Sequence, residues 1–103
     1  MKTSDNLASV AQAGPIYVLT LYVAGAEQHS RLARENLQSI CDEYLKDRCR
    51  IVEVDVLTDF ATALQERIFV TPALVLEQPE PRVTVVGTLG DRRKVLSALR
   101  LGI

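Results

Sequence analysis

Cys41 and Cys49 carry the most reactive side chains of the sequence, and their positions limit the redox or metal chemistry open to the chain. They do not form a Cys-x-x-Cys pair, and no further cysteine or histidine stands at metal-ligand spacing from them. A catalytic thiolate is favoured at a helix N-terminus, where the helix dipole lowers the thiol pKa. The loop from Ala24 to Ser30, which opens the first predicted helix, contains no cysteine. We therefore predict two reduced thiols, Cys41 in the core and Cys49 near the surface. A disulfide between them, or a redox function that uses them, is the less favoured alternative.

The remaining polar candidates are His29 with Ser30, and Glu53 with Asp55. A hydrolytic triad needs a histidine beside both a nucleophile and an acid in space, which adjacency of His29 and Ser30 in sequence does not provide. Glu53 and Asp55 are two apart on a predicted strand, so they share a face and could hold a cation or act as an acid pair. We favour a solvated strand face for them. The sequence thus predicts no catalytic residue, no metal site and no cofactor, and we expect that the protein is not an enzyme.

The composition excludes several classes of protein. The 103 residues are enough for one domain with a hydrophobic core. The formal net charge of -1 gives no bulk attraction to nucleic acid, and 48% hydrophobic residues argue against disorder. No apolar run is long enough to span a membrane, and residues 1–13 lack the apolar stretch of a secretory signal. We predict a cytoplasmic protein that binds neither nucleic acid nor membrane.

The hydrophobic pattern alternates between strand and helix periods. Residues 1–15 are small and polar and are expected to form a flexible lead, and residues 16–103 the single domain. Ser30 is the expected N-cap of the first helix. The patterns predict seven elements in the order β-α-β-α-β-β-α, over residues 16–23, 30–46, 50–56, 59–68, 73–77, 82–86 and 92–100.

The stretch from Phe69 to Val75 fixes how the second half is arranged. Because proline lacks the N–H of a sheet ladder and disfavours helix in the preceding residue, the second helix must end near Ile68 and a strand must begin after Pro72. A Thr-Pro pair before an internal strand, after a β-α-β-α run, resembles the proline loop of the thioredoxin-like fold, where that bond is usually cis. From the residues alone, cis and trans Thr71-Pro72 both stay open.

A strand-helix-strand opening requires a parallel pair with a right-handed crossover, and the Pro-rich turn at residues 78–81 supplies an antiparallel hairpin. The predicted fold class is α/β. It is a thioredoxin-like three-layer domain with a mixed four-stranded sheet.

Short motifs in a fixed order extend this resemblance to a family. They are Leu21–Gly25, Asp55–Leu57, Thr71-Pro72, Pro79-x-Pro81, Gly87 and Asp91-Arg92-x-Lys94-Val95-Leu96. Together they run from Ile16 to Leu101, and the sequence resembles the KaiB family of circadian clock proteins. It is also similar, at Val70–Val75, to the KaiB-like sensor domain of a clock output histidine kinase.

The resemblance implies a non-catalytic adaptor. KaiB-family proteins bind the KaiC ATPase ring, through it recruit KaiA, and displace the output kinase. We therefore expect a KaiC-type ATPase as partner, with a KaiA-like protein or a histidine kinase as further candidates. The positions that match the family's KaiC-facing segment are Arg67, Ile68 and Phe69, and those of the strand that pairs with KaiA are Ile51, Val52, Glu53 and Val54. The alternative is a KaiB-like regulator of stress or two-component signalling without a clock function.

Several positions depart from the family pattern. Typical members carry basic residues at the positions of Val83, Thr84, Leu76 and Leu32, and an acidic C-terminal tail that is missing here. Basic contacts to an acidic partner surface are thus depleted.

The resemblance also raises the question of which fold the chain rests in. Family members switch between a thioredoxin-like state and a ground state, often a tetramer, in which the C-terminal half is rearranged. Where clock-type members carry glycine and aspartate, this chain has Ala98 and Arg100. Helix propensity and the helix dipole then favour the last helix by roughly 1.5–3 kcal/mol. We predict that the chain rests in the thioredoxin-like fold, as a monomer or weak dimer and not as a KaiB-type tetramer, with the KaiB ground-state fold as the alternative.

Overall fold

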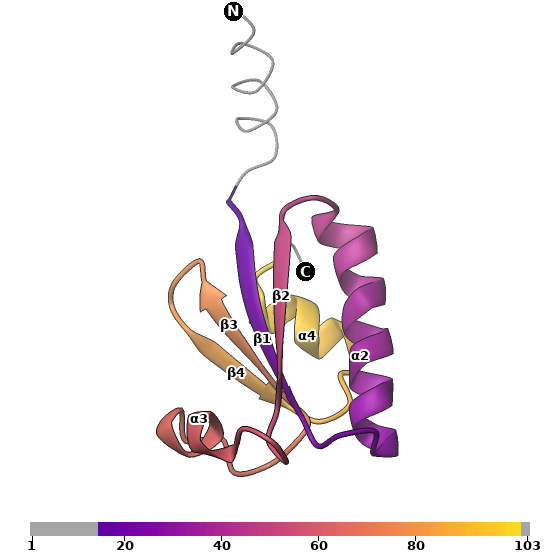
Figure 1. The fold of residues 1–103 in the computed structure, drawn as a ribbon. Coiled ribbons are helices and arrows are strands. Elements are labelled where there is room, and N and C mark those ends of the chain that lie inside the picture. Colours follow the sequence, from indigo (N-terminus) through magenta and orange to yellow (C-terminus); the bar gives the residue numbers. More distant parts are fainter. Residues whose placement is uncertain (1–14, 102–103) are drawn as a thin grey trace, which may run out of the picture.

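The computed structural model of the protein describes residues 15–101 and contains the predicted order of elements (Figure 1). Helix α2, Gln28–Ile40, continues into a π-helical segment, Cys41–Leu45, called η1. The elements are β1 Tyr17–Val23, α2 Gln28–Ile40, β2 Cys49–Asp55, α3 Phe60–Gln65, β3 Ala73–Gln78, β4 Val83–Val86 and α4 Arg92–Ala98. The flexible lead was predicted for residues 1–15, of which 1–14 lie outside the described residues.

The four strands form one mixed sheet in the order β2-β1-β3-β4. β1 pairs parallel with β2 and antiparallel with β3, and β3 pairs antiparallel with β4. In the register, Leu21 of β1 lies opposite Glu53 of β2 on one side and Leu74 of β3 on the other. The mixed four-stranded sheet of the predicted fold class is therefore confirmed, with the apolar strand β1 at its centre.

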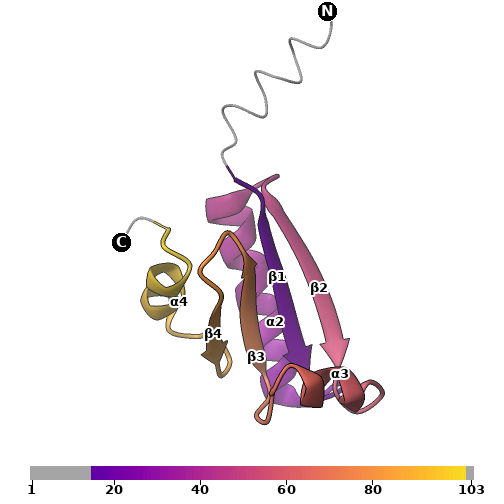
Figure 2. The ribbon, with the colours of Figure 1, turned by 90° about the vertical axis from the view of Figure 1, so that its left-hand side faces the viewer.

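Two clusters of buried side chains cover opposite faces of the sheet. Alternate residues of a strand point to opposite faces, so Val23 and Tyr22 belong to different clusters. The larger cluster packs α2 and α4 against one face, through Leu37 of α2 and Leu96 of α4 among others. The smaller one packs Ala63 of α3 against Tyr22, Ala73 and Val75. Figure 2 shows α3 at the end of the sheet opposite the turn between α2 and β2.

The start of the first helix differs from the prediction. The helix begins at Gln28, and its N-cap is Glu27, whose carboxylate accepts the backbone N–H of Ser30 at 3.2 Å. Ser30 is fully buried, and its Oγ accepts the backbone N–H of Ala24 at 3.0 Å. Ser30 as N-cap was wrong because its hydroxyl is used by the loop after β1, a tertiary contact that the local pattern does not contain.

Candidate partner-binding surfaces

Helix α3 is short and is fixed at its start by a side-chain cap. The Asp59 carboxylate accepts the backbone N–H of Thr62 at 3.3 Å and its hydroxyl at 2.9 Å. This satisfies groups at the helix start that would otherwise have no intrahelical partner. Ala63 is the buried residue of the helix, and Phe60 and Leu64, which are four apart and share one helix face, are exposed.

The end of α3 sets the direction of the loop that follows. The prediction placed this end near Ile68, but the helix ends at Gln65 and continues as a Schellman turn, in which Arg67 N–H bonds to Leu64 O at 3.0 Å and Ile68 N–H to Ala63 O at 2.8 Å. Arg67 has a left-handed φ of 61°. The turn returns Ile68 to the smaller core cluster, so the chain leaves α3 with the next residues at the surface.

Phe69 and Val70 follow this turn and are the most exposed apolar residues of the loop between α3 and β3. Their relative exposures are 76% and 57%. The Thr71-Pro72 bond is cis, and the Pro72 carbonyl accepts the backbone N–H of Gly87 at 2.9 Å, which ties the loop to the end of β4. The loop and β4 together border a groove of about 200 Å³. The lining also includes the buried Ala73, and we call the other groove-lining residues the Phe69 surface: Arg67, Ile68, Phe69, Val70, Thr84 and Val86.

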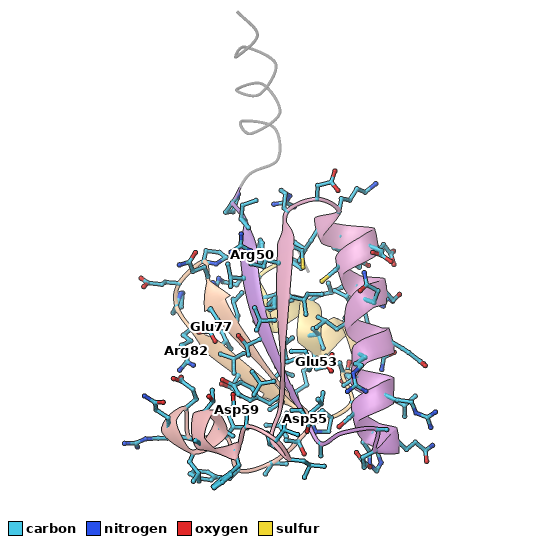
Figure 3. The ribbon with its side chains drawn as sticks, in the orientation of Figure 1. Arg50, Glu53, Asp55, Asp59, Glu77 and Arg82 are labelled. Carbon is cyan, nitrogen blue, oxygen red and sulfur yellow. The ribbon has the colours of Figure 1, made fainter. Side chains whose placement is uncertain are left out.

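A charged network lies on the same face of the sheet. Glu77 accepts the Thr20 hydroxyl and Arg82 Nε, both at 3.0 Å, and Arg82 also bonds Glu66 of the α3 C-cap at 2.6 Å. Figure 3 shows Glu77 and Arg82 side by side next to β3 and β4. Burial, together with the Glu66 and Glu77 carboxylates, raises the pKa of Tyr22, which keeps its phenol neutral. The network holds α3 and the hairpin in place beside the Phe69 surface.

Strand β2, which contains the predicted contact residues 51–54, forms an edge of the sheet. Within residues 15–101 it pairs with β1 alone, and Ile51 and Val52 are exposed while Val54 is half-buried. Glu53 points toward α2, as Figure 3 shows, where its Oε2 accepts Arg34 Nε at 2.8 Å. The structure therefore places the seven predicted contact residues at two separate surfaces: the Phe69 surface and the strand segment Ile51–Val54, which we call the β2 edge.

Amide exchange will test whether the β2 edge is open. The N–H of Val56 bonds to Val23 O at 2.8 Å, and N–H directions alternate along a strand, so Val52 and Val54 donate to β1 while Ile51 and Glu53 point outward. By NMR we expect Ile51 and Glu53 to exchange at least about tenfold faster than Val52 and Val54, which serve as internal controls. Equal, full protection of all four amides in a monomer would show that another segment covers this edge.

Asp55, at the end of β2, joins two loops. Its Oδ1 accepts the backbone N–H of Gly25, after β1, and of Leu57, before α3, each at 3.0 Å. We expect Asp55→Ala to lower the free energy of unfolding by about 1–3 kcal/mol, because both donors lose their partner. Urea unfolding followed by circular dichroism measures this. Asp47→Ala, at an exposed aspartate, is the control for the half-buried Asp55, and equal stability of the two variants would contradict the role of Asp55.

The candidate catalytic residues are not assembled into a reactive site. His29 is exposed and its Nδ1 lies 2.9 Å from the Glu27 carboxylate that caps α2. The Glu53 carboxylate accepts a hydrogen bond from Arg34, and the Asp55 carboxylate accepts two from backbone N–H groups, as described above. Within residues 15–101 no group of three or more possible metal-ligating side chains occurs. None of the helices in this part of the chain has both the length and the apolar character needed to cross a membrane.

Sequence reasoning missed part of the Phe69 surface. Val70 stands beside Phe69 in the sequence and could have been included, but Thr84 and Val86 come from β4. They reach the groove only because β4 pairs with β3, with Val86 opposite Ala73 and Thr84 opposite Val75. The i, i+4 spacing of Phe60 and Leu64 was a local signal of a second exposed apolar face that the prediction did not use.

Comparison with known proteins identifies the family of this domain. A family model described as the KaiB domain matches residues 20–101. The chain belongs to the KaiB family. The circadian clock protein KaiB3 of Synechocystis sp. is 37% identical to it over 82 residues, 80% of each chain. The circadian clock oscillator protein KaiB of Microcystis aeruginosa is 38% identical over 85 residues, 82% of each chain. The protein is thus a member of a family of circadian clock regulators.

Solved structures support the thioredoxin-like fold of this KaiB-family chain. The N-terminal domain of Synechococcus elongatus SasA superposes with a TM-score of 0.70 at 21% identity, covering 84% of this chain and 86% of that one. The germline-specific thioredoxin Deadhead of Drosophila melanogaster gives 0.67 at 13% identity, covering 98% and 94%. The likeness at these identities concerns the fold alone.

The structure also locates the departures from the KaiB pattern. Leu76, at a position that the resemblance associates with lysine, is fully buried in the larger core cluster, and Val83 packs against that cluster. Thr84 is exposed and lines the groove of the Phe69 surface, and Leu32 is exposed on α2. Two of the four lost basic positions thus lie in the interior or beside it, and one lies within the Phe69 surface.

Proposed function

We propose that this protein is a non-catalytic KaiB-type adaptor that binds a KaiC-type ATPase through the Phe69 surface. The observation that carries the proposal is the exposure of Phe69 beside Val70 and an open groove. An aromatic side chain exposed to 76% stabilises its own fold little, whereas aromatic side chains are enriched among the residues that dominate binding at interfaces. Arg67 flanks the groove and adds a donor that suits an acidic or carbonyl-rich partner surface.

The β2 edge supports a second contact by strand addition. An exposed edge strand offers backbone N–H and C=O groups that a partner strand can pair with. A KaiA-like protein is the first candidate for this contact and a histidine kinase the second. The two surfaces lie on different elements, the β2 edge and the loop after α3, so one molecule could hold two partners at once.

The proposal includes no catalysis, a cytoplasmic location and a monomer or weak dimer. Support for the absence of catalysis comes from the positions of the cysteines: Cys41 follows the C-terminal end of α2 and Cys49 begins β2, so neither lies at the start of a helix. Burial raises the pKa of both thiols, so both are protonated near neutral pH and neither is a ready nucleophile.

Direct binding to the KaiC-type ATPase of the same cell tests the proposal. The full chain is immobilised, and the ATPase is added in interferometry with ATP, with ADP and without nucleotide. We expect binding in at least one of these states, and competition by excess free chain. The absence of binding in all three states would overturn the proposal. An insulin-reduction assay run in parallel should show no activity, and turnover that is lost in a Cys41→Ser, Cys49→Ser double variant would overturn the non-enzyme assignment.

A KaiB-like regulator of stress or two-component signalling is the second candidate. It is favoured by the neutral residues at positions where typical members are basic, of which Thr84 lies within the Phe69 surface. Binding to a histidine kinase or receiver domain encoded near the gene, without binding to the KaiC-type ATPase, would establish this function in place of the first.

A further inference from the structure

The two cysteines lie against each other at the end of the molecule opposite the Phe69 surface. Cys41 stands where α2 passes into η1, and Cys49 is the first residue of β2. Figures 1 and 2 show the turn between these elements far from α3. The two Sγ atoms are 2.9 Å apart.

Backbone hydrogen bonds hold this arrangement. Lys46 N–H bonds to Cys41 O at 2.7 Å, and Arg48 N–H bonds to Leu45 O at 2.7 Å. Lys46 has a left-handed φ of 46°, which reverses the chain after η1. β2 then pairs with β1 from its first residue, with Cys49 opposite Tyr17. The approach of the thiols is therefore built into the turn and the sheet.

The burial of the two thiols and the side chains around them limit which reactions the Cys41–Cys49 pair can undergo. Cys41 is only 3% exposed, so it cannot reach the thiol of another protein, whereas Cys49 is half-buried and accessible to a small molecule. No group of three metal-ligating side chains occurs in residues 15–101, which leaves a two-thiol site without further ligands there. The partner within reach of each sulfur is the other sulfur.

We propose that Cys41 and Cys49 are a modification site that closes to a reversible intramolecular disulfide when a low-molecular-weight disulfide such as oxidised glutathione is present. The Cys49 thiolate attacks one sulfur of oxidised glutathione, forming a mixed disulfide and releasing one glutathione thiolate. The Cys41 thiolate then attacks Cys49 Sγ, forming the Cys41–Cys49 bond and releasing the second glutathione. The two protein thiols are oxidised and one glutathione disulfide is reduced to two thiols, because the two protein thiol protons pass through solvent to the two released glutathione thiolates.

The bond would link the C-terminal end of α2 to the start of the edge strand β2. Closing a short loop in the unfolded chain stabilises the folded one, so oxidation should raise Tm by about 5–15 °C. Because burial raises the pKa of both thiols, closure should be slow near neutral pH and become faster as pH rises and more thiolate forms.

Mass spectrometry of the full chain after incubation with oxidised glutathione tests the proposal. Samples are quenched with acid, unfolded and treated with a maleimide. The sequence has two cysteines, so closure gives a monomer that has lost two hydrogen atoms and takes up no maleimide. Dithiothreitol should restore two alkylation sites and the lower Tm.

Two single variants separate closure from simple modification. Cys41→Ala should trap a glutathione adduct at Cys49, and Cys49→Ser should leave Cys41 unmodified because it is buried. The main result does not depend on these variants, since it is measured on the natural chain. Two alkylated thiols at equilibrium with oxidised glutathione, a lasting glutathione adduct on Cys49 of the natural chain, or a disulfide between two chains would each overturn the proposal.

Discussion

Replacing Phe69 by alanine is expected to weaken binding to the KaiC-type ATPase by about 30-fold or more, which corresponds to about 2 kcal/mol at an interface hot spot. The same change should leave the free energy of unfolding within about 0.5 kcal/mol of the natural chain. The reason for both expectations is one observation: the ring is 76% exposed and contributes little to either core cluster. Interferometry gives the affinity, and urea unfolding gives the stability.

The control for Phe69→Ala is another exposed apolar residue outside the Phe69 surface. Ile16 is 51% exposed and precedes β1, at the end of that strand away from α3. Ile16→Ala should leave the affinity unchanged. If both variants bind like the natural chain while the natural chain does bind, then the adaptor function stands and the assignment of the Phe69 surface is wrong. An equal loss of affinity in both would point to a general defect and would also contradict this assignment.

Local patterns were sufficient to predict the elements and some of their ends. The predicted starts of the second and last helices, at residues 59 and 92, agree with the structure, in which Asp59 and Asp91 cap α3 and α4, because a carboxylate one position before a helix accepts N–H groups of the first turn. Ser30 was misjudged because a contact with Ala24 outcompetes the local cap. The ends of α3 and α4 were also not predictable from local patterns. Both helices end in Schellman turns whose left-handed residue is an arginine, Arg67 or Arg100, and not the glycine that usually marks such an end.

The candidate site was predictable only where the resemblance supplied it. Hydropathy alone would place the apolar residues Phe69 and Val70 in the core. Their exposure depends on the turn at Arg67 and on the hydrogen bond between Gly87 N–H and Pro72 O. Thr84 enters the site through strand pairing between distant segments, which no local pattern encodes. The β2 edge has a local signal, because Glu53 on an otherwise apolar strand is consistent with either a partly exposed face or an edge position.

Helix propensity and the helix dipole stabilise α4 less than the sequence predicts. Ala98 is the last residue of α4, so its advantage over glycine is smaller than at a helix interior. Arg100 lies beyond the helix with φ of 58°, a left-handed conformation that costs a non-glycine residue about 1–2 kcal/mol. Its guanidinium donates to Pro79 O at 3.1 Å, a contact with the hairpin that the dipole argument did not include. The helix is therefore held in place mainly by packing.

Leu96 provides the strongest test of that packing and of the resting fold. The side chain is 2% exposed and joins α4 to the larger core cluster with α2, β1 and β3. In the rearranged fold that the KaiB resemblance implies, residues 92–100 do not form this helix, so Leu96 would lose these neighbours. The stability effect of Leu96→Ala in the natural ground state therefore reports whether the protein rests in the thioredoxin-like arrangement.

We expect Leu96→Ala to lower the free energy of unfolding by about 2–5 kcal/mol, because it removes buried methyl groups and leaves a cavity between α4 and the sheet. Urea unfolding of a monomeric sample measures this loss. Ser97→Ala, at the adjacent exposed residue of the same helix, is the matched control and should change stability by less than about 0.5 kcal/mol. A loss below about 1 kcal/mol for Leu96→Ala would contradict this resting fold. So would chemical shifts that make residues 82–86 helical in a tetramer, because β4 then could not pair with β3 and α4 would have no sheet face to cover.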